Sequence, residues 1–200
     1  MVTGFLCFDG MTVGAVANRT KKYDEEGKET ASFEARLTTA GCEKAAAFVK
    51  TCDAFNIPVL TLTNVEGYAT SVEEEKTIAA AAAKLTAAFA ESDVPKVNMI
   101  TGNAYGSAYI TMNSKHIGAD MVFALNGAKV GMMDANVAAK IMYARQPSSQ
   151  LSPEQRQQQP EVMLILSLSR QVPESSYCML LRCFITNVSI RLARNMEPSK

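Results

Sequence analysis

The strongest constraint on the fold of this chain is an alternation of strand-like and helix-like patterns between residues 41 and 125. Three runs predict strands: IPVLTLTNV (57–65), VPKVNMIT (94–101) and DMVFAL (120–125). The first is β-branched and apolar, as is typical of a strand buried on both faces. One helix pattern precedes the first run, another separates the first run from the second, and the connections are short. This order predicts right-handed βαβ units and a mainly parallel sheet, so the predicted fold class is α/β.

The first helix pattern covers residues 41–56. Its apolar residues at helical spacing, which we predict to be buried, are Phe48, Cys52 and Phe55. Asn56 is a good residue to end this helix, and Pro58 cannot continue it. The pattern therefore predicts a helix of about four turns with a defined end.

The second helix pattern begins with an S-x-x-E capping box, from Ser71 to Glu74, and runs to about Glu91. The side that we predict to be buried carries Ile78, Leu85 and Phe89. Five consecutive alanines, residues 79–83, would let a neighbouring helix or sheet approach closely.

The segments outside this alternation are less regular. FLCFDGMTVGAVAN (5–18) predicts a hairpin, because an Asp-Gly dipeptide of the kind found in type I′ turns joins two apolar runs. Residues 19–29 are polar and predict a loop. NGAKVGMM (126–133) predicts a turn and a short strand, after which Asp134 would cap a last helix that runs to Ile141.

The composition changes abruptly near Arg145. All 11 glycines lie before this point and all seven glutamines lie after it, where aspartate is absent and Ala193 is the only alanine. Lysine outnumbers arginine 11 to 3 up to Arg145, and arginine outnumbers lysine 5 to 1 beyond it. We therefore predict one domain, residues 1–145, and a non-homologous tail, residues 146–200, to which no function is assigned.

The tail has two interpretations. Alanine codons read one base late become glutamine codons of the CAG type, so QLSPEQRQQQ is consistent with an alanine-rich helix read out of frame. In that case the tail is out of frame, and disordered or misfolded. The alternative is a natural polar linker followed by a helix.

Charge and cysteine content argue against several classes of function. The 20 basic and 20 acidic residues cancel and form no basic stripe, which argues against nucleic acid as a partner. The five cysteines include no C-x-x-C pair, which predicts reduced core thiols in a cytoplasmic protein without a metal site. We find neither a signal-peptide pattern nor an apolar run long enough to span a membrane.

The segment GNAYGSAY (102–109) follows a predicted strand and opens a helix, and three interpretations of it compete. It is a close-packed turn that needs small residues, a phosphate-binding loop, or an oxyanion hole formed by backbone N–H groups. The phosphate loop is disfavoured because both the G-x-x-x-x-G-K-[ST] and the G-x-G-x-x-G spacings are missing. The local pattern leaves the other two open.

Several separated blocks closely resemble the C-terminal half of biotin-dependent acyl-CoA carboxyltransferases. The blocks are DGMTVGAVAN, KAAAFVKTCDAFNIPVLTLTNVEGY, VPKVNMITGNAYGSAYITMNSKHIGAD and GAKVGMM, in this order, over about residues 3–144. The family includes the β subunits of propionyl-CoA and acetyl-CoA carboxylases, the carboxyltransferase of transcarboxylase and the α subunits of sodium-pumping acyl-CoA decarboxylases. The resemblance implies a crotonase-like (ClpP/crotonase) ββα spiral.

The resemblance also implies the site residues. In the family, the turn that opens AYGG or AYGS donates backbone N–H groups to the ureido oxygen of biotin; the matching residues are Gly106, Ser107 and Ala108. The family's V-P-G-F loop lines the same pocket, and its counterpart, with glutamate in place of proline, is Val65, Glu66, Gly67 and Tyr68. Tyr105 and Ile110 complete the predicted substrate- and biotin-binding set. Many relatives have an aspartate at the position of Ile110, to which acyl-chain preference is tied.

The implied function is carboxyl transfer between carboxybiotin and a short-chain acyl-CoA, namely acetyl-, propionyl- or methylmalonyl-CoA. The implied partners are a biotin carboxyl carrier protein, the acyl-CoA, and the N-terminal carboxyltransferase half or other subunits, within a homo-oligomer. This chain would supply the biotin-side half of the active site. The implied chemistry needs no side-chain base and no metal, because backbone N–H groups hold the enolate oxygens and biotin's own nitrogen takes the proton.

Two alternatives stay open. The chain is an inactive fragment or an assembly subunit of such a complex, because the family's N-terminal half is missing. It is alternatively a serine hydrolase of the same superfold, with Ser107 as nucleophile. We disfavour the hydrolase because Ser107 and the only histidine, His116, are predicted on opposite faces of one helix, about 13 Å apart along its axis.

Overall fold

A mainly parallel sheet forms the centre of the computed structural model, which describes residues 1–24, 27–134, 137–138 and 141. The strands of this sheet are β1 (Val2–Phe8), β2 (Met11–Ala17), β6 (Val59–Val65), β8 (Lys96–Tyr105), β9 (Met121–Ala124) and β10 (Lys129–Gly131). β1 and β2 form the predicted antiparallel hairpin, which turns at Asp9 and Gly10. β2, β6 and β8 are parallel neighbours, while β9 and β10 pair in succession with the other edge of β8. The predicted parallel sheet is confirmed.

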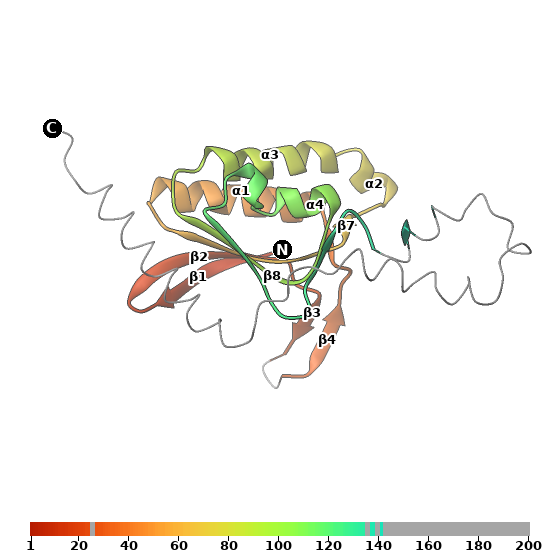
Figure 1. Ribbon diagram of the computed structural model, residues 1–200, viewed down its shortest axis with the longest axis horizontal. Helices are drawn as coiled ribbons and strands as arrows, with labels where there is room; N and C mark the ends of the chain where they lie inside the picture. The colour runs from red at the N-terminus through yellow and green to blue at the C-terminus, as the bar shows by residue number, and fades with distance from the viewer. Residues whose placement is uncertain (25–26, 135–136, 139–140, 142–200) are drawn as a thin grey trace, which may run out of the picture.

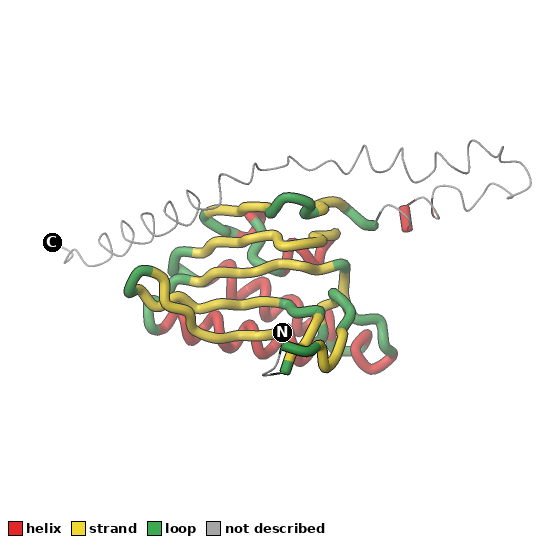
Figure 2. The backbone as a smooth tube through the Cα atoms, turned by 90° about the horizontal axis from the view of Figure 1, so that it is seen from below, coloured by secondary structure: helices red, strands yellow, loops and turns green. Residues whose placement is uncertain are grey.

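Helices cover one face of this sheet. The helices are α1 (Thr39–Ala54), α2 (Val72–Glu75), α3 (Ile78–Glu91), α4 (Gly106–Thr111) and the 3₁₀ helix η1 (Lys115–Ile117). Figure 1 shows α1 and α3 side by side above the strands, and Figure 2 shows the strands in front of the helices when the molecule is seen from below. The main apolar core lies between these layers and includes the fully buried Val16, Val49, Leu85 and Phe89.

Short strands lie outside the main sheet and correct one prediction. β3 (Lys21–Tyr23) and β4 (Glu29–Ser32) form an antiparallel pair where we predicted a loop over residues 19–29. Their side chains are mostly exposed, and Lys21 Nζ pairs with Glu29 Oε2 at 2.8 Å. A strand without a buried face lacks the apolar alternation by which strands are recognised in a sequence. β5 (Arg36–Leu37) and β7 (Gly67–Tyr68) form a second, parallel pair.

α1 begins two residues before the predicted position and presents a different buried face. Thr38 caps the helix, since its Oγ1 accepts a hydrogen bond from the Gly41 N–H at 3.2 Å. The buried face consists mainly of small residues, namely Gly41, Cys42, Ala45, Ala46, Val49 and Cys52. Phe48 is half-buried, as expected for the edge of this face. Phe55 is 72% exposed, so its predicted burial is wrong; the helix ends at Ala54, and Phe55 is the residue that caps it.

The capping box at Ser71 forms only in part, and the predicted second helix is two helices. Ser71 Oγ accepts a hydrogen bond from the Glu74 N–H at 3.2 Å. The Glu74 carboxylate does not return to Ser71; Oε2 accepts hydrogen bonds from the N–H and hydroxyl of Thr39, both at 2.6 Å. Glu74 therefore joins α2 to the N-terminus of α1. Lys76 and Thr77 lie between the end of α2 and the start of α3, so the helix is interrupted there.

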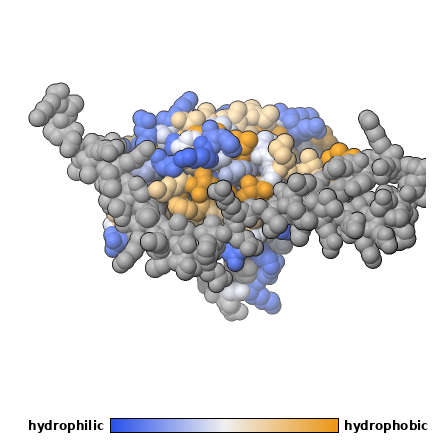
Figure 3. All heavy atoms as spheres, in the orientation of Figure 1, coloured by the Kyte–Doolittle hydropathy of each residue, from blue (hydrophilic) through white to orange (hydrophobic). Residues whose placement is uncertain are grey.

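The inner side of α3 agrees with the prediction. Leu85 and Phe89 are fully buried, and Ile78 is half-buried against the same core. The alanine run allows α1 to pack closely on one side of α3 and leaves Ala79, Ala80 and Ala83 exposed on the other. Figure 3 shows the corresponding apolar surface along the outer edge of the helix layer.

Buried polar side chains hold the sheet to the ends of α3 and α4. Lys96 Nζ donates to the carbonyl oxygens of Phe89 and Ser92, both at 2.6 Å, which satisfies two carbonyls at the C-terminus of α3. Asn98 accepts a hydrogen bond from Thr63 Oγ1 at 2.7 Å and donates to the Met112 carbonyl at 3.0 Å. These bonds fix where α4 ends relative to β6 and β8.

The last predicted helix lies only partly within the described residues. Val137, Ala138 and Ile141 are helical, and the Ala138 N–H donates to the Asp134 carbonyl at 3.0 Å. The predicted boundary at Arg145 and the whole predicted tail, residues 146–200, lie outside the described residues, so both stay predictions. Among the helices that the structure describes, none is long and apolar enough to cross a membrane.

The bond between Glu74 and α1 predicts a pH-dependent loss of stability. The Thr39 hydroxyl, and then the Thr39 N–H, hold the pKa of Glu74 below its usual 4.5. A carboxyl whose pKa is lowered by folding stabilises the protein fully above the unfolded pKa, and this contribution is lost as the pH falls through the folded pKa. We expect Glu74→Gln to lower the melting temperature near pH 7 and to differ less from the wild type near pH 3. Glu73→Gln, in the same turn, is the matched control, and an equal loss in both variants would contradict the assignment.

The described cysteines predict a fixed order of thiol reactivity. Burial raises the pKa of Cys52 to about 11. Burial and then the neighbouring Glu74 raise the pKa of Cys42 to about 11, whereas Cys7 is exposed. Because the thiolate is the reactive form, iodoacetamide near pH 8 should modify Cys7 in the native chain, and Cys42 and Cys52 only after denaturation. Peptide mass mapping over time measures this order, and native labelling of Cys52 as fast as Cys7 would be incompatible with it.

Candidate functional site

The turn between β8 and α4 is built around Gly106. β8 ends at Tyr105, and α4 begins at Gly106 with a φ of +57°, a conformation that favours glycine. A Cβ at this position would lie 3.0 Å from the Met132 carbonyl oxygen, so space also favours glycine. Tyr105 and Ala108 are buried on either side of the turn, while Ser107 is exposed. The turn therefore places the backbone of residues 106–108 at the C-terminal end of a parallel strand.

Gly102 does not belong to this turn, contrary to the sequence-based interpretation. It lies inside β8, where a Cβ would meet Asn64 Oδ1 at 2.5 Å. A glycine is needed at this position because a neighbouring side chain packs against its Cα. The glycine-rich segment thus combines a close-packing glycine at 102 with a turn glycine at 106.

The V-E-G-Y segment lies beside the Gly106 turn, as predicted. β6 ends at Val65, which pairs with Ala104 next to the end of β8. The chain then continues into β7, which Figure 1 shows next to α4. The Tyr68 hydroxyl lies 2.7 Å from Thr111 Oγ1 and donates to the Ser107 carbonyl at 3.3 Å. The structure therefore brings the two sequence-predicted segments together.

The remaining predicted site residues are Glu66, Gly67 and Ile110. Glu66 is exposed and accepts a hydrogen bond from Asn103 Nδ2 at 2.7 Å. Apart from Gly67 and its two chain neighbours, no heavy atom of the described residues lies within 4 Å of the place where a Cβ at Gly67 would stand, so the space next to this residue is open. Ile110 is 39% exposed on α4. All eight predicted positions fall within the β6–β7 segment and the β8–α4 turn.

The tyrosine before the turn stays protonated at neutral pH. Burial raises the pKa of Tyr105, and the nearby carboxylates of Asp134 and Glu66 raise it further. Burial also raises the pKa of Tyr109. A phenol that stays protonated at neutral pH cannot accept a proton there, so neither hydroxyl is suited to act as a general base.

The relation between Ser107 and His116 differs from the predicted one. The two residues do not share a helix, because α4 ends at Thr111 and Asn113 adopts a φ of +55°. His116 lies in η1 and is exposed. Within the described ranges, no hydrogen bond joins Ser107 to His116. The sequence argument about opposite helix faces was therefore wrong, although the pair that a serine hydrolase needs is still not formed.

Three asparagines that the sequence analysis did not single out connect the strand ends at this site. The Asn64 N–H donates to Asn18 Oδ1 at 2.8 Å, and Asn18 Nδ2 donates to the Asn64 carbonyl. Asn64 Oδ1 in turn accepts a hydrogen bond from the Asn103 N–H at 2.9 Å. Because these residues are 39 or more positions apart, no spacing within the sequence could have indicated the contact.

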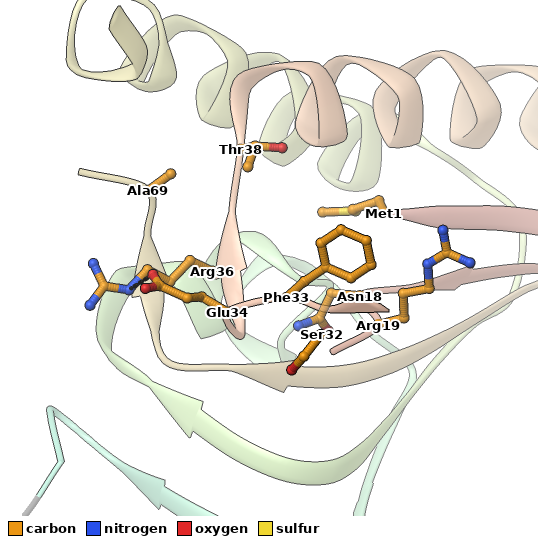
Figure 4. Close-up of a pocket in the computed structure, with 9 residues that line it drawn as sticks. All are labelled: Met1, Asn18, Arg19, Ser32, Phe33, Glu34, Arg36, Thr38 and Ala69. Atoms are coloured by element: carbon orange, nitrogen blue, oxygen red, sulfur yellow. Dashed lines mark ion pairs between the residues drawn. The ribbon is translucent and has the colours of Figure 1, made fainter. Parts of the chain in front are cut away.

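A pocket of about 490 Å³ lies next to the site, between the β3–β4 hairpin and the N-terminus of α1. Figure 4 shows Phe33 at its centre, with Met1 and Thr38 above it and the two arginines toward opposite ends. The guanidinium of Arg19 lies 5.7 Å from the centre of the Phe33 ring, and Arg36 pairs with Glu34 at 3.0 Å. None of the eight predicted site residues lines this pocket. In the described ranges no three His, Cys, Asp or Glu side chains are grouped to hold a metal ion.

Comparison with known proteins gives a consistent family. The model of the carboxyl transferase domain family matches residues 1–177. The propionyl-CoA carboxylase beta chain of Saccharopolyspora erythraea is 44% identical over 147 residues, which are 73% of this chain and 25% of that protein. The biotin-dependent acetyl-/propionyl-coenzyme A carboxylase beta5 subunit of Mycobacterium tuberculosis is 39% identical over 147 residues, again 73% of this chain and 25% of that protein.

The similarity extends to a solved structure. The hexameric transcarboxylase 12S core, crystallised with methylmalonyl-coenzyme A and methylmalonic acid, has a TM-score of 0.68 and 29% identity. The comparison covers 88% of this chain and 31% of that one. The chain therefore spans only about a quarter to a third of the length of these relatives. Because the family model covers most of the chain and the fold matches, this protein belongs to the carboxyl transferase domain family and has its crotonase-like α/β fold.

Proposed function

We propose that this chain forms the biotin-side half of an active site that transfers a carboxyl group between carboxybiotin and a short-chain acyl-CoA. The proposed acyl-CoA is acetyl-, propionyl- or methylmalonyl-CoA. The backbone N–H groups of Gly106, Ser107 and Ala108 act as the oxyanion hole. Glu66, Gly67 and Tyr68, together with Tyr105 and Ile110, line the place where the biotin ring and the substrate bind.

The observation that carries this proposal is the meeting of two segments at the C-terminal edge of parallel strands. The V-E-G-Y segment and the Gly106 turn are separated in sequence, and both match the family blocks. The Tyr68 hydroxyl bonds to the Ser107 carbonyl and Thr111, which holds the two segments together. Ligands of open α/β sheets bind outside this edge, where strands end and helices begin.

The residues present fit a flat ring that approaches the backbone. The space next to Gly67 is open and Ser107 is exposed. Positive φ at Gly106 turns the chain sharply, so a ligand can reach the following N–H groups without meeting a Cβ at the turn. Bound carboxybiotin would supply the carboxyl group, and the N–H groups of residues 106–108 would hold its ureido oxygen.

Other polypeptide segments complete the proposed enzyme. The curated relatives are about four times as long as the matched part of this chain. We propose that most of the acyl-CoA site belongs to segments outside it. We propose the N-terminal carboxyltransferase half or other subunits as the source of these segments and a biotin carboxyl carrier protein as a partner. The assembly would be a cytoplasmic homo-oligomer. An inactive fragment or an assembly subunit of such a complex is the alternative.

Carboxyl exchange tests the function. The full chain should be co-expressed with the N-terminal carboxyltransferase segment of a family member and given biotin together with malonyl- or methylmalonyl-CoA whose free carboxyl group is radiolabelled, so that transfer forms labelled carboxybiotin and leaves acetyl- or propionyl-CoA. We expect the label to exchange well above the rate in buffer. Exchange at the buffer rate in a complex that assembles would refute the proposed activity and favour the assembly subunit.

Substitution of Ser107 separates a backbone oxyanion hole from a serine nucleophile. Ser107→Ala keeps the N–H donor and the small volume, so we expect less than about a tenfold loss of exchange rate in the completed enzyme, whereas removing an oxyanion donor costs roughly 100- to 1,000-fold. A fluorophosphonate probe should not label the chain. An inactive Ser107→Ala variant, or labelling that this variant abolishes, would instead identify Ser107 as a nucleophile.

Substitution of Gly106 tests whether the site lies at this turn. Its positive φ and the nearby Met132 carbonyl mean that Gly106→Val strains the fold as well as the site. We expect this variant to lose both thermal stability and exchange activity, with a larger activity loss than Ser107→Ala. Melting temperatures measured alongside the exchange rates show how much of the loss comes from the fold. An active, stable Gly106→Val variant would contradict the placement of the site at this turn.

A further inference from the structure

The half-buried Asn64 lies at an irregularity in the sheet just before the Gly106 turn. Thr63 pairs with Ile100 and Val65 pairs with Ala104, so three residues of β8, 101–103, stand opposite Asn64 alone. Such a bulge interrupts the regular ladder and bends the strand that carries it. The direction in which β8 enters the turn therefore depends on what holds the bulge.

The Asn64 side chain supplies the hydrogen bond that the ladder omits. Its Oδ1 accepts from the Asn103 N–H at 2.9 Å, three residues before Gly106. The same amide packs against the Cα of Gly102, where a Cβ would lie 2.5 Å from Oδ1 and 2.8 Å from Cγ. The Asn64 side chain thus gives the Asn103 N–H of the bulge a hydrogen-bond partner and limits how closely β8 approaches β6 at Gly102.

The backbone of Asn64 is itself fixed from the other side. Asn18, directly after β2, receives a hydrogen bond from the Asn64 N–H and donates one to the Asn64 carbonyl. Four residues later, the Tyr68 hydroxyl bonds to the Ser107 carbonyl and Thr111 on the far side of the turn. The segment from Asn64 to Tyr68 therefore contacts the chain both before and after Gly106.

We propose that Asn64 is a positioning residue that orients the N–H groups of the Gly106 turn by holding the β8 bulge. This inference rests on the proposed function for its catalytic consequence, but the positioning is a property of the chain itself. In this proposal Asn64 does not touch biotin or the acyl-CoA, and it acts through Oδ1, which accepts the hydrogen bond from the Asn103 N–H. An oxygen at this position should preserve the effect, and an apolar group of equal size should abolish it.

Two nearly isosteric variants test this. Asn64→Asp keeps the acceptor, and Asn64→Leu keeps the volume but leaves the Asn103 N–H without its partner, the kind of loss that shifts an equilibrium by about tenfold or more. In the full chain, we expect Asn64→Leu to speed hydrogen exchange at the Asn103 amide at least about tenfold and to shift the amide resonances of Ser107 and Ala108. Asn64→Asp should leave the exchange rate at Asn103 and the resonances of Ser107 and Ala108 close to those of the wild type. The amide of Leu85 should stay protected in both variants. Similar behaviour of the two variants would overturn the proposal.

The catalytic consequence is measured in the completed enzyme. Asn64→Leu should lower kcat by about tenfold or more with KM for the acyl-CoA within about twofold, and Asn64→Asp should stay within about threefold of the wild type. Thr51→Ala, which removes one side-chain hydrogen bond on the exposed side of α1, is the control and should change neither kcat nor KM for the acyl-CoA. An equal loss of kcat in the Asp and Leu variants would contradict a role as acceptor.

The two arms separate failure of this inference from failure of the proposed function. If the wild-type complex exchanges no carboxyl group, the proposed function fails, and hydrogen exchange in the chain still decides whether Asn64 positions the turn. Should Asn64→Leu not fold, Asn64→Ala takes its place, because it removes the acceptor without adding bulk against Gly102. Unchanged exchange at Asn103 in that variant would overturn the proposal.

Discussion

The parallel pairing of β6 with β8 is the constraint on which the other elements depend. It places the ends of both strands at one edge of the sheet, from which β7 and α4 begin. Buried polar groups secure it: Asn98 of β8 bonds to Thr63 of β6 and to the Met112 carbonyl. A buried amide left without partners costs about 1–3 kcal/mol, so displacement of α4 relative to the two strands would be penalised.

Close approach of the helices to the sheet depends on small residues. Gly14 of β2 faces α1, and a Cβ there would lie 2.5 Å from Cys52 Sγ and 3.2 Å from the Phe48 ring. The face of α1 that meets the sheet is formed mainly by glycine, alanine, cysteine and valine. Small side chains bury less apolar area each, but they let the layers approach closely enough for dense packing. The same closeness raises the pKa of Cys42 and Cys52, because a thiolate loses its hydration there.

The chemistry that we propose for the turn is mainly backbone chemistry. Positive φ at Gly106 gives the chain its direction, and in the part of the chain that the structure describes no hydrogen bond joins Ser107 to His116, as a nucleophile and its base would require. A site of this kind is sensitive to the position of the peptide groups and tolerant of changes in exposed side chains. Asn64 and Tyr68 both bond to backbone groups next to the turn, namely the Asn103 N–H and the Ser107 carbonyl.

The sequence by itself determined the order of the elements, the parallel sheet, the inner side of α3 and the segments that meet at the turn. These follow from local patterns of apolar residues and from blocks of family resemblance. The tertiary structure alone decided that residues 21–23 and 29–32 pair as antiparallel strands and that Phe55 is exposed. It also decided that Glu74 bonds to α1 and that Asn18, Asn64 and Asn103 are joined by hydrogen bonds. The β3–β4 pair has no buried face and therefore no apolar alternation in the sequence. The bonds of Glu74 and of the asparagines join residues that are distant in sequence, and such polar contacts leave no periodic signal along the chain.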